Sequence, residues 1–383
     1  MNKWGISRYN FIQKNTIGYW LAISIAMYIS KIKYFNYKYT PIFYILIIFI
    51  HELLWYSLPF FNRSLYFLKD EAEVTSNWYS WGNIYCGPIK NVSNGVDWSE
   101  GLFNNNWNLS DSESYKLKYQ TYYDYLKLKP GMELLDIGCG NCQWLYFCKN
   151  KGIKCTGITI SKSNREVCNN NGITNIILGD IQKNILLKIN KKFDAISAIG
   201  PVEHFSSISE PLSHRIDILN KYYSQVKNLI KSNSSSKRYL NSIMTTNINY
   251  SKYQSLEWFF NIYFVASAFG YGYYPTEKEM NKIYNSKNSK IIIKKDYTED
   301  YRWIMIRNND SIGYCKYRIN SINRIYHLLK DILIDPSWWQ RLCYGHFDCW
   351  LWQFGGSSNK PIPHVKDTPI RGYVYVTEIN KLV

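Results

Sequence analysis

Short apolar runs alternate with longer amphipathic stretches along the chain from residue 110 onward. The apolar runs predict five strands, at 133–137, 154–160, 175–179, 193–199 and 239–246. The amphipathic stretches predict helices at 142–151, 161–171 and 211–231, after a helix that begins with the capping-box pair Ser110 and Glu113 and ends near residue 128. Strands that alternate with helices predict an α/β fold, with a parallel, doubly wound sheet covered by helices on both faces.

Two apolar segments precede this region, at 16–30 and 41–61. The first is shorter than the about 20 residues that a spanning helix needs, and the second carries His51 and Glu52. A signal peptide is disfavoured because no small-residue cleavage site follows the first segment. We therefore expect residues 1–70 to form a membrane-anchoring helical hairpin, or one span with an interfacial helix; the alternative is a soluble N-terminal domain.

The formal net charge of +17 narrows the range of partners. Such a charge suits nucleic acid, an anionic membrane surface or an acidic substrate. No arginine-rich arm or nucleic-acid motif is present, so we expect no nucleic-acid partner, and the apolar N-terminal segments favour a membrane surface. Nine cysteines without a paired framework predict reduced thiols and a catalytic domain that faces the cytosol. No motif specifies the oligomeric state.

The stretch ELLDIGCGNCQW, residues 133–144, carries candidate chemistry at the end of the first predicted strand. Its turn could cradle a nucleotide-like cofactor, hold a metal through Cys139 and Cys142, or be purely structural. A structural zinc site needs four ligands, and no second close Cys or His pair stands nearby in the sequence, so we expect no metal. Gln143 breaks the six-residue dinucleotide fingerprint, but the glycines still let a ligand approach the backbone closely.

Three stretches around this turn, LKPGMELLDIGCG, GITISKSN and FDAISAIGPVEHFSS, resemble the class I S-adenosylmethionine-dependent methyltransferases, specifically the cyclopropane-fatty-acid synthase family. The same family is followed in order by YSWGN (79–83), YGYYPT (271–276), TEDYRWIM (298–305) and GHFDCWLWQF (345–354). The resemblance implies a Rossmann-like methyltransferase domain with helical acceptor-binding additions at 75–355, and leaves 356–383 as a C-terminal tail. Membrane-anchored members, such as the sphingolipid C9-methyltransferases, carry a similar N-terminal pair of hydrophobic helices.

The resemblance implies S-adenosylmethionine as the methyl donor and indicates which residues bind it. The positions that match the family's motifs are Asp136, Gly138, Cys139 and Gly140 for the methionine moiety, Thr159, Ser161 and Asn164 for the ribose, and Asp180 and Ile181 for the adenine. Tyr79 would close over the sulfonium, next to Ser80, which stands where the family usually has Asp. Cys142 replaces the third glycine of the loop. Thr159 and Ser161 have a structural alternative as the N-terminal cap of the next helix.

Three residues are candidates for the catalytic chemistry. The resemblance places Glu203 and Tyr301 in a pocket that holds bicarbonate as the base; the structural alternative for Glu203 is a surface carboxylate that caps a helix. Two partners of that pocket are replaced, a Cys by Glu100 and a His by Met244, which argues against bicarbonate without excluding it. If Glu100 lies close to Glu203, each carboxylate raises the proton affinity of the other, and Glu100 could itself accept the proton. The alternative is that Glu100 points to solvent at the end of a loop.

The sequence therefore predicts a membrane-anchored methyltransferase whose acceptor is a membrane lipid. The expected reaction methylates or cyclopropanates an unsaturated acyl or sphingoid chain. Two alternatives remain open at this point. One is an amine N-methyltransferase of the same superfamily, and the other is a catalytically inactive, membrane-tethered binding protein that kept the fold.

Overall fold

The computed structural model of the chain describes residues 97, 99–206, 212–246, 273–286, 288–304, 306–307, 361, 368 and 370–380. All of them belong to one compact unit of the chain. The predicted hairpin at 1–70 lies outside the described residues, as do Tyr79 and Ser80. Within the described ranges, no helix has both the length and the apolar character needed to cross a membrane. The anchor therefore stays a prediction.

Seven strands form one sheet, in the order β3-β2-β1-β4-β5-β7-β6. Their bounds are β1 Glu133–Ile137, β2 Lys154–Thr159, β3 Ile176–Leu178, β4 Ala195–Ile199, β5 Arg238–Thr246, β6 Ser289–Asp296 and β7 Ile370–Ile379. The five strands expected from the apolar runs are β1 to β5, and they pair in parallel. This confirms the α/β prediction.

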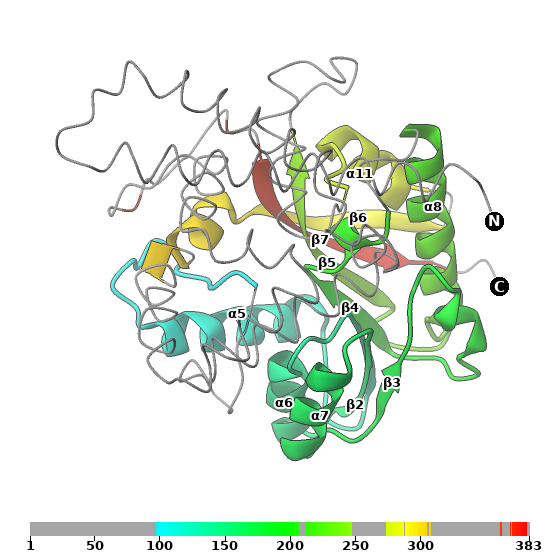
Figure 1. The fold of residues 1–383 in the computed structure, drawn as a ribbon, viewed down its shortest axis with the longest axis horizontal. Helices are drawn as coiled ribbons and strands as arrows, with labels where there is room; N and C mark the ends of the chain where they lie inside the picture. Colours follow the sequence, from blue (N-terminus) through cyan, green and yellow to red (C-terminus); the bar gives the residue numbers. More distant parts are fainter. Residues whose placement is uncertain are drawn as a thin grey trace, which may run out of the picture. The chain divides into compact units, whose positions relative to one another are not determined.

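The strand β7 corrects two parts of the prediction. It pairs antiparallel with β5, from Arg238 opposite Glu378 to Thr246 opposite Ile370, and antiparallel with β6 on its other side. The sheet is therefore mixed rather than wholly parallel, and residues 370–379 are an internal strand of the sheet instead of part of a tail (Figure 1). Val374 and Val376 are fully buried in this strand. Its partner strands β5 and β6 both lie more than seventy residues away in the sequence, so its place inside the sheet was not visible in local periodicity.

Five described helices connect or flank the strands: α5 Asp111–Tyr125, α6 Gln143–Asn150, α7 Lys162–Asn170, α8 Leu212–Leu229 and α11 Glu277–Tyr284. Figure 1 shows α5, α6 and α7 on one side of the strands and α8 and α11 on the other. The predicted capping box begins α5, because the Glu113 amide donates to Ser110 Oγ at 3.3 Å and the Ser110 amide donates to Glu113 Oε2 at 2.8 Å. Short 3₁₀ helices follow β3 and β4, η3 at Ile185–Lys188 and η4 at Val202–His204.

Tyrosine side chains fill much of the core between the sheet and the helices α8 and α11. Tyr223, Tyr239 and Tyr284 pack ring against ring, with centroids 4.8 to 5.9 Å apart. Their hydroxyls find partners inside the core; for example, the Tyr284 hydroxyl accepts from the Asn241 amide at 2.6 Å. These contacts satisfy the buried hydroxyls and hold β5 rigidly, and β5 carries part of the candidate site.

Candidate active site

The glycine loop between β1 and α6 turns away from the sheet at Gly138 and Gly140, which have φ angles of +74° and +50°. The amides of Gly138 and Cys139 both donate to the Ile158 carbonyl at 2.9 Å, which ties the loop to β2. A Cβ atom at Gly138 would stand 2.4 Å from Pro201 Cβ, whereas one at Gly140 would meet no protein atom within 4 Å. One glycine thus packs against the protein and the other faces open space, as a loop that cradles a ligand requires.

Asp136 is the next-to-last residue of β1, just before this loop, and is buried. Its Oδ1 accepts from Ser197 Oγ at 2.6 Å, and Ser197 Oγ accepts in turn from Trp144 Nε1 at 3.0 Å. Burial raises the pKa of the Asp136 carboxyl to about 7, against the opposing effect of the Ser197 hydrogen bond. A cationic group placed beside this carboxyl would favour its ionised form.

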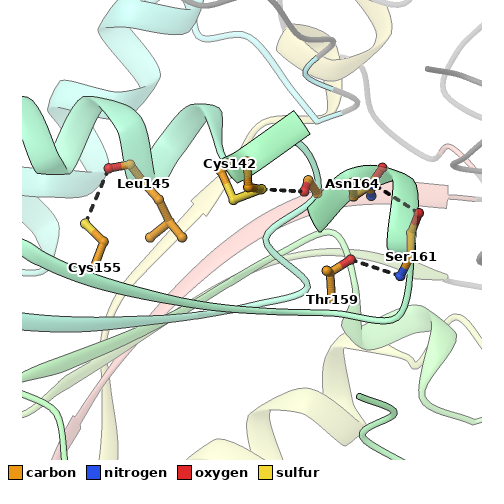
Figure 2. Close-up of a disulfide and its surroundings, with 8 residues drawn as sticks. Cys142, Leu145, Cys155, Thr159, Ser161 and Asn164 are labelled. Carbon is orange, nitrogen blue, oxygen red and sulfur yellow. Dashed lines mark hydrogen bonds between the residues drawn. A yellow bond between two sulfur atoms is a disulfide. The ribbon is translucent and has the colours of Figure 1, made fainter. Parts of the chain in front are cut away.

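A disulfide joins the loop to the next helix and corrects the expectation that all cysteines are reduced. Cys142, the residue before α6, is bonded to Cys168 of α7, 26 residues further along the chain (Figure 2). The thiol of Cys139 is the third sulfur of this cluster, and all three sulfurs lie within 4.8 Å of one another. No second close Cys or His pair stands near Cys139 and Cys142 in the sequence, but helix α7 brings Cys168 against the loop in the folded chain. Burial raises the pKa of the Cys139 thiol well above its usual range.

Three predicted ribose-binding residues surround the start of α7, at the carboxyl end of β2. Ser161 is the N-cap, and its Oγ accepts from the Asn164 amide at 3.2 Å. Thr159 Oγ1 accepts from the Ser161 amide at 3.2 Å (Figure 2). The structural alternative, a role as the N-terminal cap of the helix, therefore holds for Ser161. These hydrogen bonds fix the turn at the end of β2, and β2 is the neighbour of β1, which the glycine loop follows.

Asp180 and Ile181 follow β3, the next strand in the sheet, and both are partly exposed. Asp180 Oδ1 accepts from the Gln182 amide at 2.9 Å, and its Oδ2 lies 3.7 Å from Lys183 Nζ. The predicted cofactor residues within the described ranges thus stand at the carboxyl ends of three adjacent strands, β1, β2 and β3. Ligands bind at this edge in sheets of this type.

Glu100 is buried rather than pointing to solvent, with a relative exposure of 3%. Its Oε1 accepts hydrogen bonds from the hydroxyl of Tyr122 on α5 and from Ser242 Oγ on β5, the latter at 2.7 Å. The segment that carries it is held by Lys118, a fully buried residue of α5 whose Nζ lies 2.6 Å from both Asp97 Oδ2 and Ser99 Oγ. The surface alternative for Glu100 is therefore wrong.

Glu203 lies in η4, directly after β4, and is 1% exposed, which rules out a surface cap. Its Oε1 accepts from the Met244 amide at 3.4 Å, while its Oε2 is buried and has no hydrogen-bond partner among the described residues. Burial raises the pKa of the Glu203 carboxyl to about 8, and the charge of Glu100 acts in the same direction. Glu203 is therefore a carboxyl that binds a proton near neutral pH.

Tyr301 belongs to a helical stretch at 298–304 and is largely buried. The preceding residue, Asp300, accepts from the Phe103 amide at 2.7 Å, which fixes this helix to the segment that carries Glu100. Burial raises the pKa of Asp300 to about 7, and the charge of Glu100 contributes.

Sequence reasoning missed Tyr122, Ser242, Asp300 and Ser197, which hold or surround the predicted carboxylates. Tyr122 is one of 35 tyrosines, and that abundance hides any single functional one. Ser197 is the one polar residue of an otherwise apolar strand, and this pattern could have indicated it. Ser242 has no such signal, because its strand also contains Asn241, Thr245 and Thr246.

The fold and the site define a class. A sheet of seven strands with an antiparallel β7 between β5 and β6, and a glycine loop after β1, is the architecture of class I S-adenosylmethionine-dependent methyltransferases. Residues 92–319 match the family model described as mycolic acid cyclopropane synthetase. Because the match covers more than half of the chain, the chain belongs to this family. The predicted cofactor, S-adenosylmethionine, and the predicted enzyme class are thereby confirmed at the level of the family.

The relatives agree with this assignment. A cyclopropane-fatty-acyl-phospholipid synthase of Escherichia coli is 36% identical over 105 residues, 25% of each protein. A probable fatty acid methyltransferase of Mycobacterium tuberculosis is 26% identical over 144 residues, 36% of this chain and 31% of that protein. In these matches the chain therefore spans a third or less of the relatives' length.

Solved structures show the same fold at low sequence identity. The cyclopropane synthase MmaA2 from Mycobacterium tuberculosis has a TM-score of 0.56 at 16% identity, over 81% of this chain and 99% of that chain. The mycolic acid cyclopropane synthase CmaA1, complexed with SAH and CTAB, has a TM-score of 0.54 at 14% identity, over 80% and 95%. Coclaurine N-methyltransferase, bound to N-methylheliamine and SAH, has a TM-score of 0.52 at 14% identity, over 86% and 92%.

Proposed function

We propose that this protein transfers the methyl group of S-adenosylmethionine to a membrane lipid, at an unsaturated acyl or sphingoid chain, to give a methyl-branched or cyclopropane product. The observation that carries the proposal is a pair of buried carboxylates in a chain of this family. Glu100 accepts a hydrogen bond from Ser242 of β5, and Glu203, which follows β4, accepts one from the Met244 amide of β5. The names of the two curated relatives, a fatty-acyl-phospholipid synthase and a fatty acid methyltransferase, support a lipid acceptor.

The residues at the ends of β1, β2 and β3 fit the cofactor and are proposed to bind it. The open space beside Gly140 admits a ligand against the backbone, and the buried carboxyl of Asp136 suits a cationic amino acid moiety. Thr159 and Ser161 would face the ribose, and Asp180 would accept from the adenine amino group. When bound, the cofactor supplies an electrophilic methyl group, which the protein must hold in line with the acceptor.

Methylation of an alkene needs a base, and this requirement favours the lipid acceptor. Addition of a methyl cation to a double bond leaves a carbocation on the chain, and a proton must then be removed. Glu203 offers a buried, unpartnered oxygen within the described residues, at the sheet edge where the reaction belongs. Tyr301, from the helix next to the Glu100 segment, supplies an aromatic face that can stabilise the cation.

The membrane anchor is the second part of the proposal. The apolar segments within residues 1–70 would hold the catalytic domain at the surface from which a lipid chain enters, with the domain on the cytosolic side. The net charge of +17 suits an anionic leaflet.

The test is methyl transfer from labelled S-adenosylmethionine by the purified full-length chain. Vesicles of phosphatidylglycerol with cis-monounsaturated chains are the acceptor, and matched vesicles with saturated chains are the control. We expect label in the lipid fraction and a gain of one CH₂ on the acyl chain, with unsaturated vesicles only. Label on small amines in place of lipid would favour an N-methyltransferase. Cofactor binding without transfer to any acceptor would favour the inactive binding protein.

A further inference from the structure

Two carboxylates converge on one stretch of β5 and differ in their hydrogen bonding. Glu100 accepts from the hydroxyls of Tyr122 and Ser242, whereas Glu203 accepts from the Met244 amide with one oxygen and keeps the other unpartnered within the described part of the chain. The two anchor positions are two residues apart on the same strand, a span of about 7 Å. Two hydroxyl donors thus fix Glu100 in place, whereas Glu203 keeps one buried oxygen that can accept a proton.

We propose that Glu203 is the base that removes the proton after methyl transfer, and that Glu100, the carboxyl group fixed beside it by two hydroxyl donors, sets its proton affinity. The proposal rests on the proposed function and deepens it, because it makes the chain supply its own base. Glu203 would then be a catalytic residue and Glu100 a positioning residue that acts through it.

The proton balance is complete without a further reactant. The π electron pair of the alkene forms the new C–C bond as the S–CH₃ bond breaks, which leaves neutral S-adenosylhomocysteine and a carbocation on the acyl chain. A C–H bond of the added methyl group then breaks and its electron pair closes the cyclopropane ring, or a C–H bond on a carbon next to the cationic carbon breaks and its electron pair forms a new double bond. In either case the proton goes to Glu203 Oε2. Glu203 returns the proton to water after the product leaves.

Several charged or titratable groups face the two carboxylates. The charge of Glu100 raises the pKa of four nearby groups. These are Tyr119 and Tyr122 from α5, and Tyr297 and Asp300 from the segment at 297–304. Asp300 is the only one of these four groups that ionises near neutral pH, because burial raises its pKa to about 7 while the tyrosines stay neutral. Asp300 must therefore be controlled for in any pH measurement at this site.

The experiment compares Glu203→Gln, Glu100→Gln and Glu100→Asp in the full-length chain, with Asp300→Asn as the electrostatic control. Glu113→Gln is the matched remote control, because Glu113 lies on the exposed first turn of α5 and Gln keeps the capping box. Turnover is followed from pH 5.5 to 9.5 in buffers with and without added bicarbonate. The carboxylic acid carbonyl stretch is followed by infrared spectroscopy over the same pH range.

We expect the parent turnover to rise with pH to a midpoint near 8, with no dependence on bicarbonate. Glu203→Gln should lower turnover at least a hundredfold, in the range of a lost general base. Glu100→Gln should move the midpoint down by on the order of one pH unit, because it removes a negative charge that raises the pKa of Glu203 from a neighbouring position. Glu100→Asp should restore the parent midpoint. Asp300→Asn and Glu113→Gln should leave that midpoint in place.

The infrared titration separates this proposal from the proposed function. The proposal is supported, even if no lipid is methylated, by a carboxyl signal that titrates with a midpoint near pH 8 in the parent. This signal should be absent in Glu203→Gln, and its titration midpoint should fall in Glu100→Gln. An unchanged signal in Glu100→Gln overturns it, even if the lipid reaction is confirmed. Turnover that stops when bicarbonate is stripped from the parent enzyme also overturns it, because an external base would then be required.

Discussion

The glycine loop gives the sharpest test of how the cofactor site is built. Gly138, Gly140 and Gly131 all have φ angles in the left-handed region, +74°, +50° and +88°, but their surroundings differ. A Cβ at Gly138 would collide with Pro201 at 2.4 Å, while one at Gly140 or Gly131 would meet nothing within 4 Å. Substituting each glycine by alanine therefore separates three effects: the cost in stability of the left-handed backbone, the cost in stability of the contact with Pro201, and the change in S-adenosylmethionine affinity.

The magnitudes follow from these contacts. Each alanine carries the backbone cost of a left-handed residue, about 1–2 kcal/mol. Gly138→Ala adds the strain of an overpacked contact with Pro201, about 1–3 kcal/mol. The loss of unfolded-state entropy is common to all three variants, so it cancels in their differences. We expect the free energy of unfolding to fall by about 2–5 kcal/mol in Gly138→Ala, and by about 1–2 kcal/mol in Gly140→Ala and Gly131→Ala.

Urea unfolding measures the stabilities, and calorimetry measures S-adenosylmethionine affinity in the folded variants. Gly140→Ala should lose affinity well beyond its stability cost, because its methyl group enters the space beside the loop where the ligand would lie. Gly131→Ala, at an exposed turn before β1, should bind like the parent. Equal stability of Gly138→Ala and Gly140→Ala would refute the Pro201 contact. Parent-like affinity in Gly140→Ala would refute the placement of the cofactor.

Four other predictions concern the disulfide, pH, a buried ion pair and the anchor. Cys168→Ser removes the disulfide and should lower the free energy of unfolding of the oxidised protein by about 3.5 kcal/mol. This magnitude is the loop-closure entropy for a separation of 26 residues. An equal loss of stability in the presence of reductant would contradict this prediction. The Glu203 pKa is raised from 4.5 to about 8 on folding, so its contribution to stability is present below about pH 4.5 and is lost as pH rises to 8. Glu203→Gln should flatten that part of the pH–stability curve, and an unchanged slope would exclude a buried, protonated carboxyl. Lys118→Met should cost about 3–5 kcal/mol by leaving the Asp97 charge buried without its partner, and adding Asp97→Asn should recover most of it in urea unfolding. Deleting residues 1–70 should release the chain from membranes in flotation assays while cofactor binding persists; a full-length chain that stays soluble without detergent would refute the anchor.

Local patterns in the sequence were sufficient for the first five strands, the helices between them and the glycine loop. The strand β1 was predicted at its observed bounds, and the capping box of α5 was predicted from Ser110 and Glu113. These features depend on neighbours within a few residues, where side-chain periodicity and capping chemistry act directly. The family resemblance is carried by the same local stretches.

Contacts between distant segments were decided only by the tertiary structure. The strand β7 lies inside the sheet because it pairs with β5 on one side and with β6 on the other. Cys168 meets Cys142 because helix α7 packs beside the glycine loop. Glu100 is buried because Lys118 holds its segment against α5 and because Ser242, 142 residues away, donates to it. Such pairings depend on how the sheet and helices close around one another, and local sequence periodicity carries no information about them.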